Sequence, residues 1–371
     1  MPGRSGTAPS PWLVSRRTDL LLFGGSTLAS LALLALGQAT GLLHASLPPV
    51  LWLAFVVGVD VAHVWSTGWM VYADPEELGR RRSLYLALPG AAFAAGVVAH
   101  ALSPALFWRL LAYSAVFHFV RQQYGWVALY RRKNGEPAEP GDRFARRLDA
   151  WVIYGATLAP LVWWHAHLPR QFHWLLAGDF VPGLPAPFGV FALVLFALVL
   201  ATYAGKELLR AVRGRPTSWG KNLVVASTVV TWFLGIVVFD SDYAFAVTNV
   251  LVHGIPYIGI VRATCEARGV ARESRGRSPS LADRAARTLP LFVGPLLLVA
   301  LVEEWGWDRL VWHDHPGFFP GPSVDPGPLL LSLVVPLLAL PQATHYLLDA
   351  WIWKMKPVNA ETARALGIAR R

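Results

Sequence analysis

Ten long stretches of apolar residues constrain the fold of this chain more than any other feature. A helix that crosses the ~30 Å hydrocarbon core of a bilayer needs about 20 mostly apolar residues. Polar and apolar residues do not alternate along these stretches, as they would in the strands of a membrane barrel. The sequence therefore predicts an all-α integral membrane protein, a single polytopic domain over residues 1–371 with about ten transmembrane helices. The stretches are residues 19–40, 48–72, 84–102, 105–130, 148–167, 185–209, 222–239, 243–261, 289–302 and 328–353.

The basic residues follow the order of these ten spans. The chain has a net charge of +10, although only 15% of its residues are charged. Lysines and arginines gather at the N-terminus and in alternate connections, whereas the remaining connections hold only Arg170 and Arg309 among several acidic residues. This positive-inside distribution predicts that both termini are cytoplasmic, in a bacterial-type inner membrane. Anionic lipid headgroups account for the excess charge, so we expect no nucleic-acid partner. The basic segments are residues 16–17, 80–82, 131–133, 143–147, 210–221, 262–287 and 354–371.

Four segments are expected to lie outside the membrane. They are a cytoplasmic tail over residues 1–17, a cytoplasmic loop over 262–288, an outer loop over 303–327 and a cytoplasmic tail over 354–371. The first span follows Arg16 and Arg17 and is similar to a signal peptide, but we expect it to remain as an uncleaved helix. Cys265 is the only cysteine, so an intramolecular disulfide is excluded.

Four of the spans carry a histidine together with a second polar residue. The second residue is three or four positions away and therefore shares a helical face with the histidine. All four spans are even-numbered and run from outside to inside. The number of residues between the histidine and the cytoplasmic end of the span is the same for His63, His253 and His345. His118 lies about one helical turn deeper in the membrane. We expect one layer of histidines in the cytoplasmic half of the bilayer. The pairs are Asp60/His63, His118/Gln122, Asn249/His253 and His345/Asp349.

A metal ion bound by these groups explains why they lie in the membrane. Charged residues at the centre of a membrane helix cost about 2.5–3.5 kcal/mol each on insertion scales, so Asp60, Arg121 and Asp349 need partners or a function. Imidazole and carboxylate groups together suit non-haem iron, without excluding zinc, copper or manganese. The predicted ligands are His63, His118, His253, His345, Asp60 and Asp349, supported by Gln122, Asn249, Arg121 and Tyr257.

Two other interpretations of the same residues remain open at this stage. The histidines and amides could be polar contacts between helices, or they could form a pathway for protons or ions. A second group of histidines lies in the predicted outer loops beside tryptophans, where contacts at the membrane interface are a sufficient explanation. These residues are His165, His167, His173, His313 and His315.

The four intramembrane histidines give the chain a loose resemblance to the histidine-rich integral-membrane iron enzymes. These are the fatty-acid desaturase and hydroxylase group and the bacterial carotenoid-cleaving oxygenases. The resemblance covers His63, His118, His253 and His345 with their neighbours, and the His-x-x-His-His and His-x-x-x-His motifs of desaturases do not occur. The resemblance implies that the protein binds iron and uses oxygen to attack a lipid-soluble substrate. It is a likeness between the sites and does not make the chain a member of either family.

We therefore expect a metal-dependent membrane oxidoreductase, with iron as the metal and a lipid or isoprenoid as substrate. An electron donor would approach from the cytoplasmic face. No catalytic residue is assigned. The alternatives are a proton- or ion-coupled transporter that uses the same His and Asp groups, and a haem-binding membrane cytochrome. An oxidoreductase should have an apolar pocket from the metal toward lipid, whereas a transporter should have a polar path outward past Asp60.

Overall fold

The protein is built from helices alone, as the sequence predicts. The computed structural model describes residues 10–44, 46–134 and 142–368. It is 78% helix, and no strand occurs in those ranges. The all-α class is therefore confirmed.

Short π-helical or 3-10 stretches, labelled η, precede, follow or interrupt the α-helices. In chain order the elements are α1 (Arg16–Asp19), η1 (Leu20–Gly25), α2 (Ser26–Thr40), η2 (Leu42–His44), α3 (Pro49–Trp52), η3 (Leu53–Val61), α4 (Ala62–Met70), α5 (Pro75–Arg80), α6 (Arg82–Leu102), α7 (Pro104–Lys133), α8 (Asp142–His165), α9 (Ala186–Val212), α10 (Trp219–Trp232), η4 (Phe233–Val238), α11 (Asp242–Phe245), η5 (Ala246–Val250), α12 (Leu251–Glu273), α13 (Leu281–Ala285), α14 (Leu289–Trp307), η6 (Asp308–Trp312), α15 (Gly327–Leu338), α16 (Leu340–Ile352), η7 (Pro357–Asn359) and α17 (Ala360–Ala365).

Eight helical segments in the described ranges are long and apolar enough to cross a membrane. Each corresponds to one of the predicted spans. The other two predicted spans coincide with α7 and α8, which are 30 and 24 residues long. The eight segments are Arg16–Thr40, Pro49–Met70, Arg82–Leu102, Ala186–Val212, Trp219–Val238, Asp242–Glu273, Leu289–Trp312 and Gly327–Ile352.

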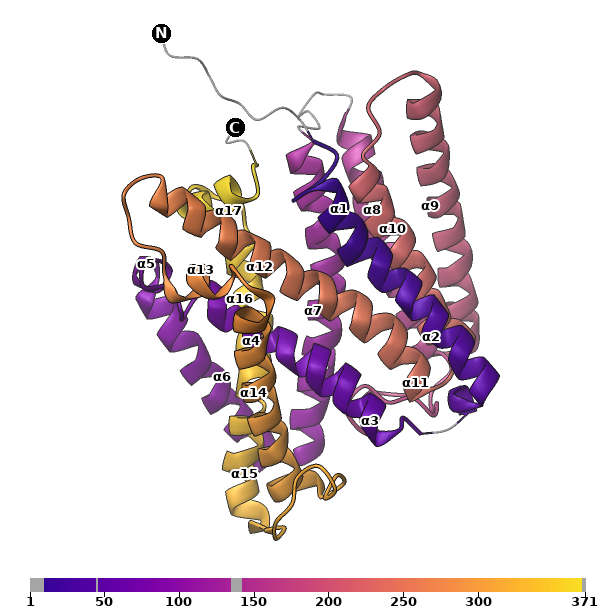
Figure 1. Cartoon of the computed structure of the whole chain (residues 1–371). Coiled ribbons are helices and arrows are strands. Elements are labelled where there is room, and N and C mark those ends of the chain that lie inside the picture. Colours follow the sequence, from indigo (N-terminus) through magenta and orange to yellow (C-terminus); the bar gives the residue numbers. More distant parts are fainter. Residues whose placement is uncertain (1–9, 45, 135–141, 369–371) are drawn as a thin grey trace.

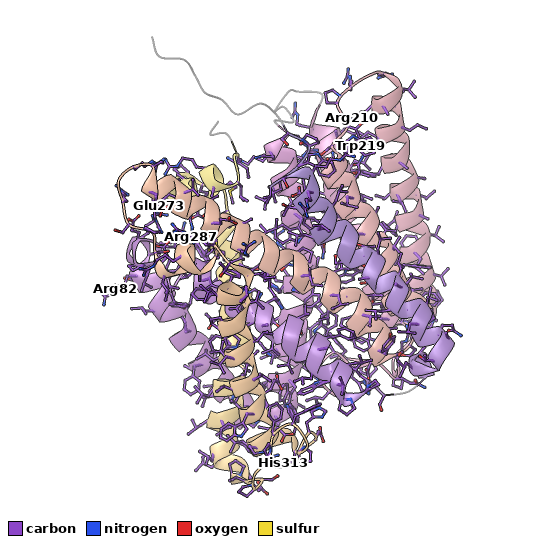
Figure 2. All side chains as sticks on the ribbon, viewed as in Figure 1. Arg82, Arg210, Trp219, Glu273, Arg287 and His313 are labelled. Carbon is purple, nitrogen blue, oxygen red and sulfur yellow. The ribbon has the colours of Figure 1, made fainter. Side chains whose placement is uncertain are left out.

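The long helices run side by side in one bundle, with the short helices at its ends. Helices α1 and α17, near the two ends of the described chain, lie at the upper end of the bundle in Figure 1, as do α5 and α13. The opposite end holds α3, α11 and the start of α15. Figure 2 shows Arg210 at the same end as α17 and Arg287 below it, near α13, whereas His313 lies at the opposite end.

Two segments expected to be loops contain more helix than the sequence pattern suggested. In the predicted loop 262–288, α12 continues through Glu273, because the buried side chains of Arg268 and Arg272 pair with Asp74 and Asp283. The short helix α13 follows it. In the predicted loop 303–327, helix continues to the end of η6, and irregular structure occupies only residues 313–326.

Candidate metal centre

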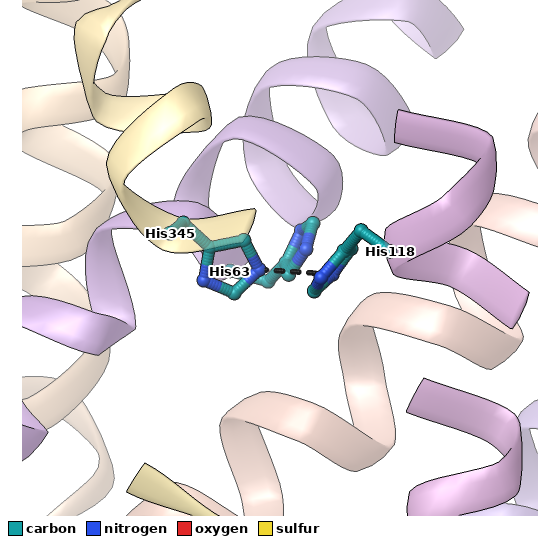
Figure 3. Close-up of side chains that lie close together, drawn as sticks. All are labelled: His63, His118 and His345. Carbon is teal, nitrogen blue, oxygen red and sulfur yellow. Dashed lines mark hydrogen bonds between the residues drawn. The ribbon is translucent and has the colours of Figure 1, made fainter. Parts of the chain in front are cut away.

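The four intramembrane histidines converge at one place in the bundle. They come from α4 (His63), α7 (His118), α12 (His253) and α16 (His345), and each side chain is at most 3% exposed. Figure 3 shows His63, His118 and His345 pointing toward one another from three helices. One ring nitrogen from each of these three lies within 4.8 Å of the others, a spacing that could hold a metal ion. The predicted histidine cluster is therefore present.

His253 completes the cluster from a fourth helix. Its Nε2 atom lies 3.2 Å from Nε2 of His118 and 3.1 Å from Nε2 of His63. The Nε2 atom of His345 lies 3.1 Å from that of His118. Four nitrogens bound to one ion at 2.0–2.1 Å in a tetrahedron would lie about 3.3–3.4 Å apart, so these spacings are close to those of a metal-binding set.

Hydrogen bonding alone cannot account for these three contacts. A ring nitrogen of neutral histidine carries either one hydrogen or one lone pair, so it takes part in one hydrogen bond in the plane of the ring. The Nε2 atoms of His118 and His253 each face two other Nε2 atoms. Any assignment of tautomers therefore satisfies at most two of the three contacts. A cation at the common point would accept all four lone pairs.

Close packing of α12 against the second span brings His253 to His63. Gly254 faces Val59 of η3, and a Cβ on Gly254 would lie 2.7 Å from Cγ1 and 3.1 Å from the carbonyl oxygen of Val59. The ring of Phe119 stacks on the His253 ring with 3.6 Å between centroids. The π-helical stretches η3 and η5 directly precede the helices that carry His63 and His253, and such stretches are frequent at functional sites.

The two aspartates lie on the opposite side of the imidazole rings from the common point. An Oδ1 atom of Asp60 is 3.4 Å from Nδ1 of His63. The carboxylate of Asp349 is 3.6 Å from Nδ1 of His118 and 3.9 Å from Nδ1 of His345. Carboxylates beside the outer nitrogen of a ligating histidine orient its ring and increase its basicity. Both positions suit this orienting role.

The other predicted supporting residues occupy three different surroundings. Tyr257 donates a 2.5 Å hydrogen bond to Asp349, and Gln122 donates a 3.0 Å bond to the backbone carbonyl of His253. Asn249 is buried and donates to the hydroxyl of Thr248. Arg121 is exposed and contacts the Tyr154 hydroxyl and the face of Tyr124, away from the histidine cluster.

Three neighbours of the cluster were not predicted from the sequence. Thr67 Oγ1 lies 2.6 Å from Nδ1 of His345, Phe119 stacks on His253, and Tyr346 stacks on His118 with 4.8 Å between centroids. Thr67 stands four residues after His63, so the spacing that selected the other polar neighbours could have identified it. The two aromatic residues immediately follow a site histidine and have no comparable signal in a chain rich in aromatic residues.

A cavity of about 730 Å³ begins at the cluster. His118, Tyr257, Tyr346 and Asp349 form its inner end. It then runs between α7 and the C-terminal part of α16, and we call it the α7–α16 groove. At one side it is lined by Phe117 and Leu158, whose side chains are 63% and 46% exposed on the outside of the bundle.

The outer-end histidines take part in separate local contacts. His315 stacks on Trp52, and His167 stacks on Trp163 and contacts its backbone carbonyl. His165 contacts Tyr113, and His313 contacts the backbone carbonyl of Asp308. Across the described ranges, none of these histidines belongs to a group spaced to hold a metal ion.

Comparison with known proteins found no match among protein-family models, curated proteins or solved structures. The site must therefore be interpreted from its own geometry.

Proposed function

We propose that this protein is a metal-dependent membrane oxidoreductase, with iron as its metal and a lipid or isoprenoid from the bilayer as its substrate. The observation that carries the proposal is the set of three Nε2–Nε2 contacts among His63, His118, His253 and His345, which hydrogen bonding cannot satisfy. Four neutral imidazoles suit iron, copper or zinc far better than magnesium or calcium. A redox-active ion would supply one-electron chemistry, which the protein then directs through binding and orientation.

The protein's own residues have three roles in this proposal. Asp60 and Asp349 lie 3.4–3.9 Å from the outer nitrogens of His63, His118 and His345, and Thr67 contacts that of His345, so these groups would orient the three rings. Tyr257 donates a hydrogen bond to Asp349 at the inner end of the groove. Burial of all four histidines keeps bulk water from the site, and the groove gives an apolar molecule access from the side of the bundle.

The proposal includes a topology of ten membrane spans with both termini in the cytoplasm of a bacterial-type inner membrane. Eight apolar segments support it directly, and α7 and α8 are long enough to supply the other two. The basic residues then face the cytoplasm, where a soluble electron donor would approach.

Metal analysis of the purified full-length protein tests the proposal. We expect about one iron per chain and no haem absorbance. His118→Ala should remove the metal, whereas the matched variant His167→Ala should retain it. A wild-type protein that stays free of iron, copper and zinc after reconstitution contradicts the proposal.

A proton- or ion-coupled carrier is the second candidate, and buried carboxyl groups on α14 favour it. Glu303 and Glu304 are 6% and 8% exposed, and Glu303 accepts a 2.6 Å hydrogen bond from Trp65. These groups extend the polar residues from His63 toward the outer end of the bundle.

Proton flux in liposomes distinguishes the two candidates. A carrier should move protons or another ion in a way that Glu303→Gln abolishes, whereas Glu266→Gln, an exposed control, should leave transport intact. An oxidoreductase should show no such flux and should keep its metal in both variants.

A further inference from the structure

The α7–α16 groove has a strongly basic far end. Arg132 and Lys354 line it there. Arg132 is about 21 Å along α7 from His118 at 1.5 Å per residue, and Lys354 follows α16, whose end at Ile352 is about 10 Å from His345. Both side chains are exposed. Among the described residues no carboxylate pairs with either one, and Lys354 lies over the Trp351 ring. Two cations without acidic partners at the end of one groove form a site for an anion.

The charge along the groove is asymmetric. Its only acidic lining residue is Asp349, at the inner end, where it accepts the hydrogen bond from Tyr257. The walls between the two ends are mostly aromatic or aliphatic and include Trp126 and Leu129. Arg121 also lines the groove, where its guanidinium contacts the Tyr154 hydroxyl and the face of the Tyr124 ring. An occupant with its charge at the basic end would therefore place an apolar chain against these walls and toward the histidines.

The dimensions agree with a single lipid chain. Half of the ~30 Å hydrocarbon core, the depth reached by one chain in its leaflet, is about 15 Å. This is comparable with the distance from the basic end to the histidine cluster. A volume of about 730 Å³ also lies within the range of ligand pockets, roughly 300–1,000 Å³.

We infer that the α7–α16 groove binds a single-chain amphiphile with an anionic head, a carboxylate or a phosphate. Arg132 and Lys354 hold the head, and the chain extends along the groove to His118. The inference rests on the proposed function only in naming this amphiphile as the substrate. Binding itself does not require the metal.

Binding of radiolabelled hexadecanoate to the purified full-length protein tests this inference. Hexadecanoate or hexadecyl phosphate should bind, and whichever binds more tightly identifies the head group. Methyl hexadecanoate and hexadecyltrimethylammonium should bind at least about tenfold more weakly, since they cannot accept charge-assisted hydrogen bonds from the two cations. Arg132→Gln combined with Lys354→Gln should weaken hexadecanoate binding by about tenfold or more. Lys356→Gln, an exposed cation outside the groove, is the matched control.

A second pair of variants tests the position of the chain. A side chain at Gly125 would meet nothing within 4 Å at its Cβ, so Gly125→Leu fills the groove without disturbing α7. It should abolish hexadecanoate binding and leave metal content unchanged. Gly205→Leu, on the exposed face of α9, should change neither.

Equal binding of hexadecanoate and its methyl ester, or full binding in the Arg132/Lys354 double variant or in Gly125→Leu, overturns the inference. Charge-dependent binding to a protein that holds no metal supports the inference while contradicting the proposed oxidoreductase. A protein that holds the metal but binds hexadecanoate and its methyl ester equally contradicts the inference and leaves the proposed oxidoreductase supported.

Discussion

Gly254 lies against Val59 with no room for a side chain between α12 and η3, and its neighbour His253 reaches His63 through this contact. The position therefore couples helix packing to the geometry of the histidine cluster. A substitution there tests whether the cluster depends on the distance between these two helices.

Gly254→Ala should reduce the metal content and the stability of the protein together. The added Cβ would lie 2.7 Å from a Val59 side-chain carbon and 3.1 Å from its backbone oxygen, so one helix must move. Overpacking of this kind costs about 1–3 kcal/mol. Metal analysis and thermal unfolding measure the two effects. Gly68→Ala on α4, where a Cβ meets nothing within 4 Å, is the control and should change neither. Unchanged metal content in Gly254→Ala would show that the cluster tolerates separation of α12 and η3.

Thr67→Val should weaken metal binding by about 10–100-fold, the range typical of losing a partner of a ligating histidine. The Thr67 hydroxyl contacts Nδ1 of His345 at 2.6 Å, and valine has the same shape without the hydrogen bond. Thr67→Ser retains the hydroxyl and should bind metal almost normally. Competition with a chelator of known affinity provides the measurement. Equal affinities in the Val and Ser variants would assign Thr67 to packing alone.

The sequence located the eight apolar helical segments and the four clustered histidines because both depend on local periodicity. Apolar runs identify the membrane segments, and polar pairs three or four residues apart identify a helical face. Contacts between helices far apart in the chain have no such local signal. The stacking of Phe119 on His253 depends on how α7 and α12 pack, and so does the distance between Gly254 and Val59.

The same reason explains why helices continue into segments that the sequence pattern left as connections. Arg268 and Arg272 made residues 262–273 resemble a basic loop, but their partners Asp74 and Asp283 lie on other elements. Pairing across elements kept this stretch helical. Gly254 and Pro256 could also interrupt a helix, but α12 continues through both residues.

Reporter fusions test the proposed topology. A fusion after Arg275 should give a cytoplasmic signal, and a fusion after Pro316 should give a periplasmic one. The two sites lie in the connections that flank α14, so a single membrane crossing separates them. The same compartment for both sites would remove α14 from the set of membrane spans. Reversed signals would contradict the positive-inside assignment.

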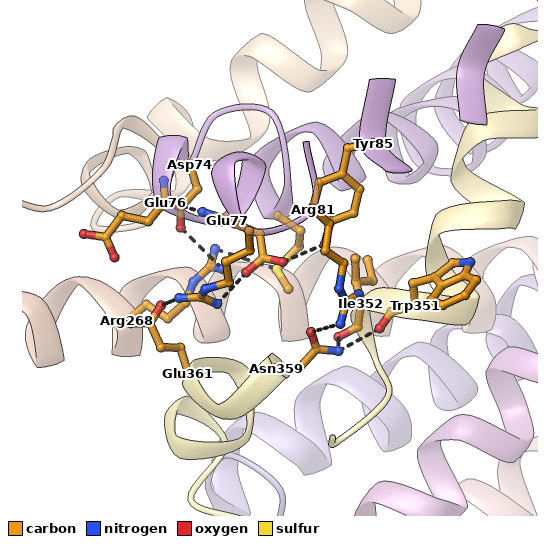
Figure 4. Close-up of polar contacts among 12 residues, drawn as sticks. Asp74, Glu76, Glu77, Arg81, Tyr85, Arg268, Trp351, Ile352, Asn359 and Glu361 are labelled. Atoms are coloured by element: carbon orange, nitrogen blue, oxygen red, sulfur yellow. Dashed lines mark hydrogen bonds and ion pairs between the residues drawn. The ribbon is translucent and has the colours of Figure 1, made fainter. Parts of the chain in front are cut away.

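At the basic end of the bundle α17 packs against α12, and Glu361 of α17 pairs with Arg80 of α5. Figure 4 shows Glu361 near Arg268, while Asn359 joins the chain after α16 to the backbone of Trp351 and Ile352. Burial by itself would raise the pKa of Glu361, but the hydrogen bond from Arg80 and the positive charges of Arg80 and Arg272 outweigh it and lower this pKa.

A carboxyl whose pKa is lower in the folded state stabilises the fold in its ionised form. The contribution is complete above the pKa of the unfolded chain, about 4.3 for glutamate, and is lost as the pH falls through the folded value. Tm should therefore decrease on acidification below about pH 4.3, and Glu361→Gln should lower Tm at neutral pH and show a smaller further decrease in acid. Glu266→Gln, with its carboxylate 48% exposed, is the control and should follow the wild-type profile. Thermal unfolding of the detergent-solubilised protein across this pH range measures the effect. Parallel profiles of Tm against pH for the wild type and Glu361→Gln would show that the contacts of Glu361 do not stabilise the packing of α17.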